Sequence, residues 1–112
     1  MNLVAMMVAA KNLILNKSNW TKGMLARDKC GNAVCPESKE ACQFCAMGAL
    51  DRIIKKEEAG PVNANFLRKE LHRAAQRMGR NSAIAVNDAC EHSDVMKMFD
   101  EAIATLPADV PV

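Results

Sequence analysis

Apolar residues recur every three or four positions along most of the chain, the spacing that gathers them on one face of an α-helix. The pattern predicts four main helices, at about residues 2–16, 39–57, 64–79 and 92–106. A shorter helix through Ala26 is expected with Thr21 as its N-cap, and residues 82–88 fit either a short helix or an extended connector. No segment alternates convincingly, as a half-buried strand would. The sequence therefore predicts an all-α, compact bundle of about four to five helices.

The helix predicted at residues 39–57 contains the most apolar helical stretch in the middle of the chain. Ser38 is its expected N-cap, and an irregular loop over residues 28–38 precedes it. Gly48 and Ala49 are small enough to let a neighbouring helix approach closely. We therefore expect this central helix to be the buried spine around which the other helices pack.

The composition is typical of a soluble globular protein, with 50% hydrophobic and 25% charged residues. A chain of 112 residues is expected to form a single helical domain, residues 1–112. The apolar residues 1–10 are not preceded by a basic segment and fall far short of the roughly 20 that cross a bilayer. These features predict a cytoplasmic protein without a membrane partner. Trp20, the only tryptophan, is expected to anchor in the core rather than to bind a ligand.

Four of the five cysteines lie close together in the sequence, at Cys30, Cys35, Cys42 and Cys45. Four thiolates can bind zinc tetrahedrally, and a Cys-x-x-Cys pair at a helix start supplies two of them. The spacing between Cys30 and Cys35 is looser than is usual in such sites, and a helical core of this size does not need a metal to fold. We therefore expect no cofactor, reduced thiols and a buried Cys45. A structural or catalytic zinc or thiol site at the four cysteines is the alternative.

Thiol catalysis would require a base near Cys45, and the chain offers only His72 and His92. His72 is expected on the polar side of its helix and His92 at a helix start, so both are interpreted as surface residues. A redox role for the Cys-x-x-Cys pair lacks the strand that such motifs usually follow. The sequence thus favours a protein without catalytic activity.

Basic residues line one side of the helix predicted at residues 64–79 and could contact nucleic-acid phosphates or an acidic protein. No aromatic residue is interleaved with them, and the net charge of the chain is only +2. A solvated or ion-paired helix face is therefore the simpler interpretation, and weak nucleic-acid binding is an alternative. The candidate binding residues of this helix are Lys69, Arg73, Arg77 and Arg80.

A polar cluster, in which Asn87 and Asp88 are followed by Glu91, His92 and Asp94, precedes the last predicted helix. Asn and Asp favour caps and turns, and acidic residues are stabilising in the first turn of a helix. We interpret the cluster as helix capping in preference to a metal or acid–base site.

Four short stretches, taken in their order and spacing, resemble a small family of uncharacterised bacterial and phage proteins. They are Trp20-Thr21-x-Gly23, Cys45-x-x-Gly48-Ala49, Asn87-Asp88, and the final segment from Asp94 to Ile103. The resemblance covers about residues 3–106 and implies a bacterial or phage cytoplasmic setting, but no activity. It also implies that Cys30 and Cys35 stand where relatives carry polar loop residues, which weakens the zinc alternative.

Together these observations predict a non-enzymatic helical module that binds a protein partner. By analogy with small phage proteins, it would act as an inhibitor or accessory factor that binds a host protein. Its candidate contact surfaces are the segment from Trp20 to Asp28, the loop through Cys35 and the basic helix face. Val4, Val8 and Leu15 widen the apolar face of the first helix and would suit a homodimer.

Overall fold

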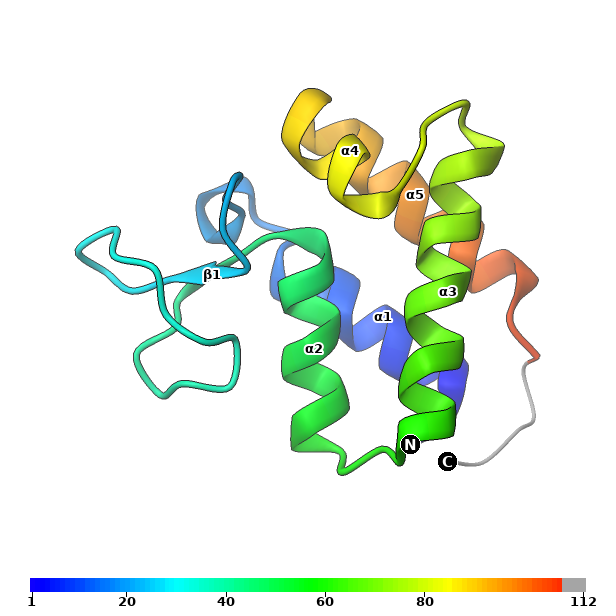
Figure 1. Ribbon diagram of the computed structural model, residues 1–112, viewed down its shortest axis with the longest axis horizontal. Helices are drawn as coiled ribbons and strands as arrows, with labels where there is room; N and C mark the ends of the chain where they lie inside the picture. The colour runs from blue at the N-terminus through cyan, green and yellow to red at the C-terminus, as the bar shows by residue number, and fades with distance from the viewer. Residues whose placement is uncertain (108–112) are drawn as a thin grey trace.

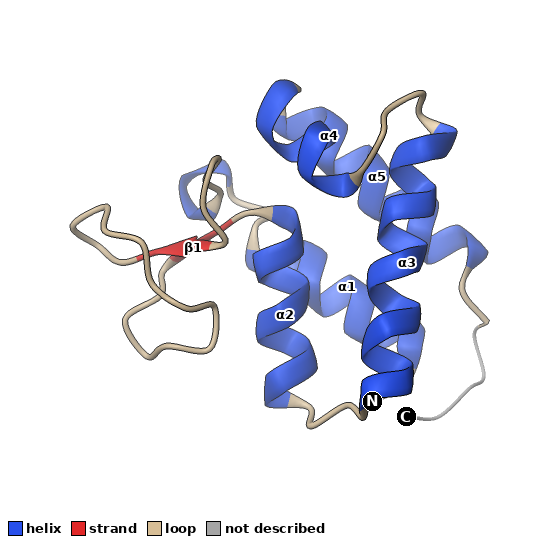
Figure 2. Ribbon diagram, in the orientation of Figure 1, coloured by secondary structure: helices blue, strands red, loops and turns tan. Residues whose placement is uncertain are grey.

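The computed structural model of the protein describes residues 1–107 and contains five α-helices and a small two-stranded hairpin (Figures 1 and 2). The helices are α1 (Leu3–Leu13), α2 (Ala46–Lys56), α3 (Pro61–Arg77), α4 (Ala83–Ala89) and α5 (His92–Thr105). The shorter elements are the 3-10 helix η1 (Lys17–Asn19) and the strands β1 (Ala26–Arg27) and β2 (Gln43–Phe44). The predicted compact helical bundle is confirmed. Residues 108–112 of the predicted domain lie outside the described residues.

The core is aliphatic and lies between the helices. α2 packs against α1, and α5 packs against α1, α3 and α4. The largest side chains with almost no solvent exposure come from all five helices and the end of α1, and they include Met6, Ile14, Leu50, Leu71, Val86 and Phe99. Seven of the eleven residues of α2 are buried, so its predicted burial is confirmed. The other helices do not all pack around it, because its main neighbour is α1, whereas α3 and α4 contact α5 more extensively than they contact α2.

α2 begins later than predicted, at Ala46 rather than at residue 39. Residues 39–42 offer only Ala41 as an apolar side chain, so a helix there would have no stripe to bury against the core. Cys45 is the N-cap, and its Sγ accepts a hydrogen bond from the Gly48 N–H at 3.2 Å. Ser38, the predicted cap, closes only a turn, in which its Oγ accepts from the Glu40 N–H at 3.1 Å.

The helix predicted between Thr21 and Ala26 is absent, and a hairpin takes its place. β1 pairs antiparallel with β2, with Ala26 opposite Phe44 and Arg27 opposite Gln43. Gly23 has a positive φ of 81°, a conformation that interrupts a right-handed helix. Strands of two residues are too short to show the alternation by which a strand is recognised, so this small hairpin was not predicted. The described chain is nevertheless mostly helical, as the all-α prediction requires.

The second half of the chain follows the prediction more closely. α3 starts at Pro61, earlier than predicted, because proline fits the first turn of a helix, where no N–H partner is needed. The segment at residues 82–88 is helical and forms α4, where the Ser82 Oγ accepts from the Ala85 N–H at 3.1 Å. α5 agrees with the helix predicted at residues 92–106.

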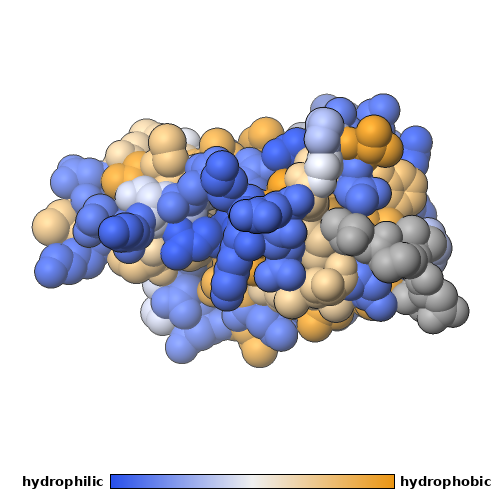
Figure 3. Space-filling model, turned by 90° about the horizontal axis from the view of Figure 1, so that it is seen from below, coloured by the Kyte–Doolittle hydropathy of each residue, from blue (hydrophilic) through white to orange (hydrophobic). Residues whose placement is uncertain are grey.

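Hydrophilic residues cover much of the middle of the face seen from below (Figure 3). Of the helices in residues 1–107, none has both the length and the apolar character that crossing a membrane requires. Val4 packs against the core, whereas Leu15 is 54% exposed, so only part of the wide apolar face of α1 is covered within the chain.

Candidate functional site

The segment from Trp20 to Leu25, here called the Trp20 loop, is fixed to the helices by the side chain of Asn87. Asn87 lies in α4 and is 1% exposed. Its Oδ1 accepts hydrogen bonds from the Trp20 Nε1 at 2.7 Å and from the Ala46 backbone N–H at 2.9 Å. Its Nδ2 donates to the Thr21 carbonyl and to the Asp88 Oδ1, both at 3.0 Å. One buried amide therefore joins the loop, the first turn of α2 and α4.

Asp88 fixes the next part of the loop. Its Oδ1 accepts from the Gly23 backbone N–H at 3.1 Å, in addition to the bond from Asn87. Among the described residues the carboxylate has no ion-pair partner, and its Oδ2 accepts no hydrogen bond. Asp88 therefore positions a backbone amide while keeping its negative charge uncompensated.

The capping role predicted for Asn87 and Asp88 was wrong, because both residues lie inside α4 and bond to the Trp20 loop. For Glu91 and Asp94 of the same cluster the predicted capping is confirmed, because they form a reciprocal capping box at the start of α5. The spacing of residues in the sequence could have predicted that Asn87 is buried. Asn87 follows Ala83 by four residues, so it lies on the same buried face of the helix.

Arg27 ties the Trp20 loop to the hairpin. Its Nε donates to the Thr21 Oγ1 at 2.8 Å, and its two Nη atoms donate to the carbonyls of Gly31, at 3.0 Å, and Lys22, at 3.1 Å. The Thr21 N–H also donates to the Phe44 carbonyl at 3.0 Å. These bonds satisfy backbone groups of a segment that has no regular secondary structure, and they hold it in one conformation.

Both histidines make structural contacts. His92 packs edge-to-face against Trp20, with ring centroids 5.3 Å apart, and its Nε2 lies 2.7 Å from the Ile14 carbonyl, to which it donates. The Nδ1 of His72 accepts from the Ala83 N–H at 3.0 Å, at the start of α4. Both histidines are partly exposed, and each joins two elements through its ring.

The close approach predicted at Gly48 exists, but the neighbour is the Trp20 loop and not a helix. A Cβ at Gly48 would lie 1.8 Å from the Leu25 carbonyl oxygen and 2.7 Å from its carbon. The same carbonyl accepts from the Cys45 N–H at 3.1 Å. The absence of a side chain at position 48 lets the loop backbone lie directly on α2.

Cys45 is buried under this loop at 6% exposure, as predicted. Burial is the main reason that the pKa of its thiol is raised, hydrogen bonds from the Gly48 and Met47 backbone oppose the shift, and the negative charges of Asp88 and Asp51 add to it. A thiol that stays protonated at neutral pH is a poor nucleophile and metal ligand. This environment suits a structural cysteine.

The other cysteines of the predicted zinc site are exposed, and the structure does not gather the four. Cys30 and Cys42 border one surface hollow, whereas Cys35 borders a different one. In the part of the chain that the structure describes, no three side chains of His, Cys, Asp or Glu converge in an arrangement that could hold a metal ion.

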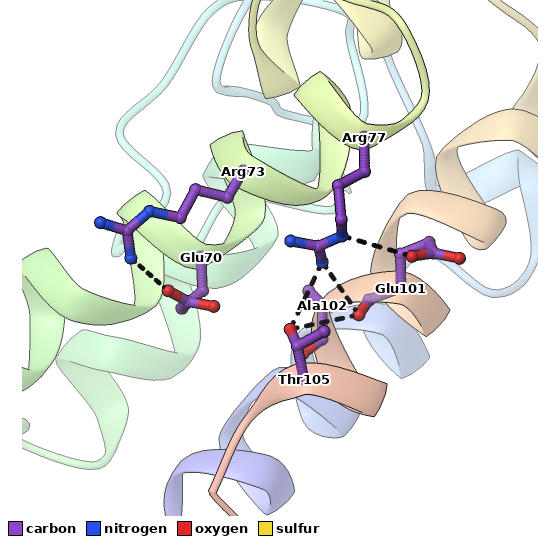
Figure 4. Close-up of polar contacts among 6 residues, drawn as sticks. All are labelled: Glu70, Arg73, Arg77, Glu101, Ala102 and Thr105. Carbon is purple, nitrogen blue, oxygen red and sulfur yellow. Dashed lines mark hydrogen bonds and ion pairs between the residues drawn. The ribbon is translucent and has the colours of Figure 1, made fainter.

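Three of the basic residues predicted to bind lie on α3, and Arg80 lies just beyond its end. Two of the four are already paired (Figure 4). Arg73 forms an ion pair with Glu70 one turn earlier in the same helix. Arg77 reaches α5, where it contacts the Glu101 carboxylate at 3.4 Å and donates to the Glu101 carbonyl at 3.2 Å. Lys69 and Arg80 are exposed and have no ion pair within residues 1–107.

A small pocket opens where the Trp20 loop meets α4. It measures about 190 Å³ and is lined by Gly23, Met24, Leu25, Cys45, Ile84, Asn87 and Asp88. Three large apolar side chains surround it and remain exposed, at 45% for Met24, 43% for Leu25 and 50% for Ile84. We call these three residues the apolar rim and the hollow between them the rim pocket. The binding residue predicted in this region, Trp20, lies beneath the surface as a partly buried support.

Comparison with known proteins places the chain in a family. No curated protein and no solved structure gives a significant match. One family model matches residues 2–105, which includes every helix and both strands described above. The match agrees with the predicted resemblance to an uncharacterised family, and it assigns no activity. The chain belongs to DUF6197, a family of unknown function.

Proposed function

We propose that the protein is a non-enzymatic binding module that contacts another protein through the apolar rim. One observation carries the proposal. Met24 and Leu25 of the Trp20 loop and Ile84 of α4 are exposed around one pocket. The loop backbone that carries the first two is fixed by the polar bonds of Asn87, Asp88 and Arg27. Grouped apolar side chains on a surface otherwise rich in polar groups are typical of protein-interaction sites.

The fixed backbone favours binding on energetic grounds. A flexible loop loses conformational freedom when it docks, and this loss weakens the complex. In the Trp20 loop, Gly23 and Thr21 are already held by Asp88 and Asn87 before any partner arrives. The rim can therefore be presented to a partner at little further entropic cost.

The chemistry around the rim pocket supports binding better than catalysis. Cys45 is the nucleophilic side chain at the pocket, and burial keeps its thiol protonated by raising its pKa. His92 and His72, the histidines of the chain, are engaged with the Ile14 carbonyl and the Ala83 N–H. Neither histidine is among the described residues that line this pocket, so Cys45 has no imidazole beside it to remove its proton.

The resemblance to bacterial and phage proteins favours a cytoplasmic host protein as the partner, bound by an inhibitor or accessory factor. This step is analogy with other small proteins of that origin. A zinc site at the four cysteines has less support, because Cys35 borders a different surface hollow from Cys30 and Cys42, and Cys45 is buried. Nucleic-acid binding through α3 also has less support, because Arg73 and Arg77 already have carboxylate partners.

Affinity capture with rim variants tests the proposal. Tagged wild-type protein is incubated with a lysate of the native organism beside Leu25→Asp and Ile84→Asp, which place a charge on exposed positions of the rim. Val62→Asp is the matched control, because Val62 is 80% exposed on α3 and lies outside the rim. We expect a protein that is retained by the wild type and by Val62→Asp and lost with both rim variants.

Circular dichroism of all four proteins shows whether the substitutions leave the fold intact. A set of captured proteins that is the same for the wild type and for both folded rim variants contradicts the proposed function.

A further inference from the structure

We infer that the rim pocket receives a basic side chain, a lysine or arginine of the partner protein, whose aliphatic stem lies against the rim and whose cation meets Asp88. The inference rests on the proposed function and specifies the chemistry of the contact. It follows from the size of the pocket, its walls and the unpaired charge at its edge.

The size of the rim pocket limits the occupant to a single side chain. Its volume of about 190 Å³ is smaller than the roughly 300–1,000 Å³ of sites for drug-sized ligands. A helix or strand of the partner would therefore stay outside, on the apolar rim, while one long side chain enters.

The walls match a chain of methylene groups. Leu25, Met24 and Ile84 contribute apolar side chains, and the Gly23 backbone closes one side without a Cβ. Lysine and arginine cover apolar surfaces with their stems while keeping the charged end in a polar place. The rim can thus bind the stem by the same apolar contact that would bind leucine or methionine.

Asp88 distinguishes a basic occupant from a purely apolar one. Its Oδ1 is held by Gly23 and Asn87, and its Oδ2 accepts no hydrogen bond among the described residues. Asp88 is exposed and is among the residues that line the pocket, so its carboxylate is accessible at the edge of the pocket. A neutral occupant would shield this carboxylate from water without replacing the lost solvation, whereas a cation would pair with it.

Two cations of the Trp20 loop and the adjoining strand, Lys22 and Arg27, are engaged elsewhere. Arg27 donates three hydrogen bonds within the Trp20 loop and the hairpin. The Lys22 ammonium lies 5.2 Å from the centroid of the Trp20 ring, where it is attracted by the π face. Asp88 is therefore available for a cation that comes from outside the chain.

Small side-chain analogues test the inference directly. The full-length protein, labelled with ¹⁵N, is titrated with n-butylammonium, n-butylguanidinium and, as the neutral analogue, 1-pentanol. We expect all three to shift the amide resonances of Gly23, Leu25 and Ile84, and the two cations to bind about three- to fivefold more tightly, as expected for one partly exposed ion pair.

Two variants and the salt dependence isolate the charge. Asp88→Asn retains an oxygen that accepts from the Gly23 N–H but loses the charge, so it should bind the cations no better than 1-pentanol. Glu40→Gln removes the same charge from an exposed residue outside the rim pocket, so this variant should still bind the cations more tightly than 1-pentanol. In the wild type, added salt should weaken the binding of the two cations and leave the binding of 1-pentanol unchanged. This last measurement does not depend on whether the Asp88 variant folds.

Equal binding of cations and alcohol, or the absence of binding at the rim by any probe, overturns the inference. The two proposals fail separately. If the rim variants lose a captured protein but the pocket shows no preference for the cations, the proposed binding function stands and the rim pocket receives a side chain other than lysine or arginine. A cation preference without any rim-dependent partner leaves the pocket chemistry standing and removes the proposed function.

Discussion

The helices and the segment from Trp20 to Cys45 are stabilised by different kinds of interaction. In the view of Figure 1 this segment lies beside α2, on the side away from α3. The helices bury an aliphatic core, in which Phe99, Leu50 and Leu71 have no measurable exposure. The segment instead exposes Met24 and Leu25 and depends on hydrogen bonds from a few side chains of the helices and hairpin.

The difference shows how a protein of this size can carry a fixed irregular surface. Apolar burial is non-directional and tolerates many arrangements, whereas a hydrogen bond specifies the position of the groups that it joins. Asn87 uses its oxygen for Trp20 and Ala46 and its nitrogen for Thr21 and Asp88. The helical core supplies the stability, and this single amide supplies the position of the loop.

The largest effect is expected from the core. Phe99→Ala should lower the free energy of unfolding by about 3–5 kcal/mol, because it removes a fully buried ring and leaves a cavity. The loss should be global, so every buried amide of α1, α3 and α5 should exchange faster with solvent. Urea unfolding followed by circular dichroism gives the magnitude. Phe66→Ala, at a half-buried position of α3, should cost clearly less, and an equal loss would contradict the assignment of Phe99 to the centre of the core.

The next largest effect is expected where the two regions meet. Gly48→Ala places a Cβ 1.8 Å from the Leu25 carbonyl oxygen, so either the loop or the helix must move. We expect a loss of about 3 kcal/mol, at the upper end of the usual cost of overpacking. Gly60→Ala is the control, because a Cβ at Gly60 meets nothing within 4 Å. Similar melting temperatures for the two variants would show that the loop does not need its close contact with α2.

The sequence predicted the helical region well, because its stabilising interactions repeat along the chain. The stripes of α3 and α5 consist of apolar residues at helical spacing, and a periodic pattern records which side of a helix is buried. For the same reason the burial of Cys45, at the N-cap of α2, and of Leu50 within that helix could be predicted. Within these helices the errors lie at the ends. The start of α2, for example, is at Ala46, and the first residues of the predicted helix, residues 39–42, are mostly polar.

The candidate site could not be predicted in the same way, because its interactions occur once and join distant residues. The Trp20 side chain and the Asn87 side chain are separated by 67 positions, and neither carries a local signal that names the other. The resemblance grouped Trp20, Gly48 and Asn87 as motifs without giving a reason. The structure supplies one, since all three position the same loop.

An intermediate and local effect is expected from the loop anchor. Asn87→Ala leaves the Trp20 Nε1 and the Ala46 N–H without their acceptor, at a cost of about 2 kcal/mol for the unsatisfied groups. Because the core does not contain this bond network, the Trp20 loop should open while the helices persist. Trp20 fluorescence should shift to longer wavelength, and the amides of Thr21 and Gly23 should exchange faster.

The exposed Asn12 on α1 provides the matched substitution. Asn12→Ala should change the free energy of unfolding by less than about 0.5 kcal/mol, as is usual for surface positions. If Asn87→Ala instead unfolds the whole chain in a single transition, the loop and the helical core are one cooperative unit and the distinction between them fails.

The smallest effect is expected from pH and concerns the thiol beneath the loop. Burial raises the pKa of Cys45 in the folded protein, so the unfolded chain loses this proton more readily. The contribution of Cys45 to stability is therefore complete below the pKa of the unfolded thiol and declines as the pH rises through the higher pKa of the folded state. Cys45→Ser keeps an oxygen that can cap α2 and does not titrate in this range. Urea unfolding from pH 8 to pH 11 should show a steeper loss of stability for the wild type than for Cys45→Ser. Lysine titration affects both proteins alike, so parallel curves would mean that the Trp20 loop does not shield Cys45 from water.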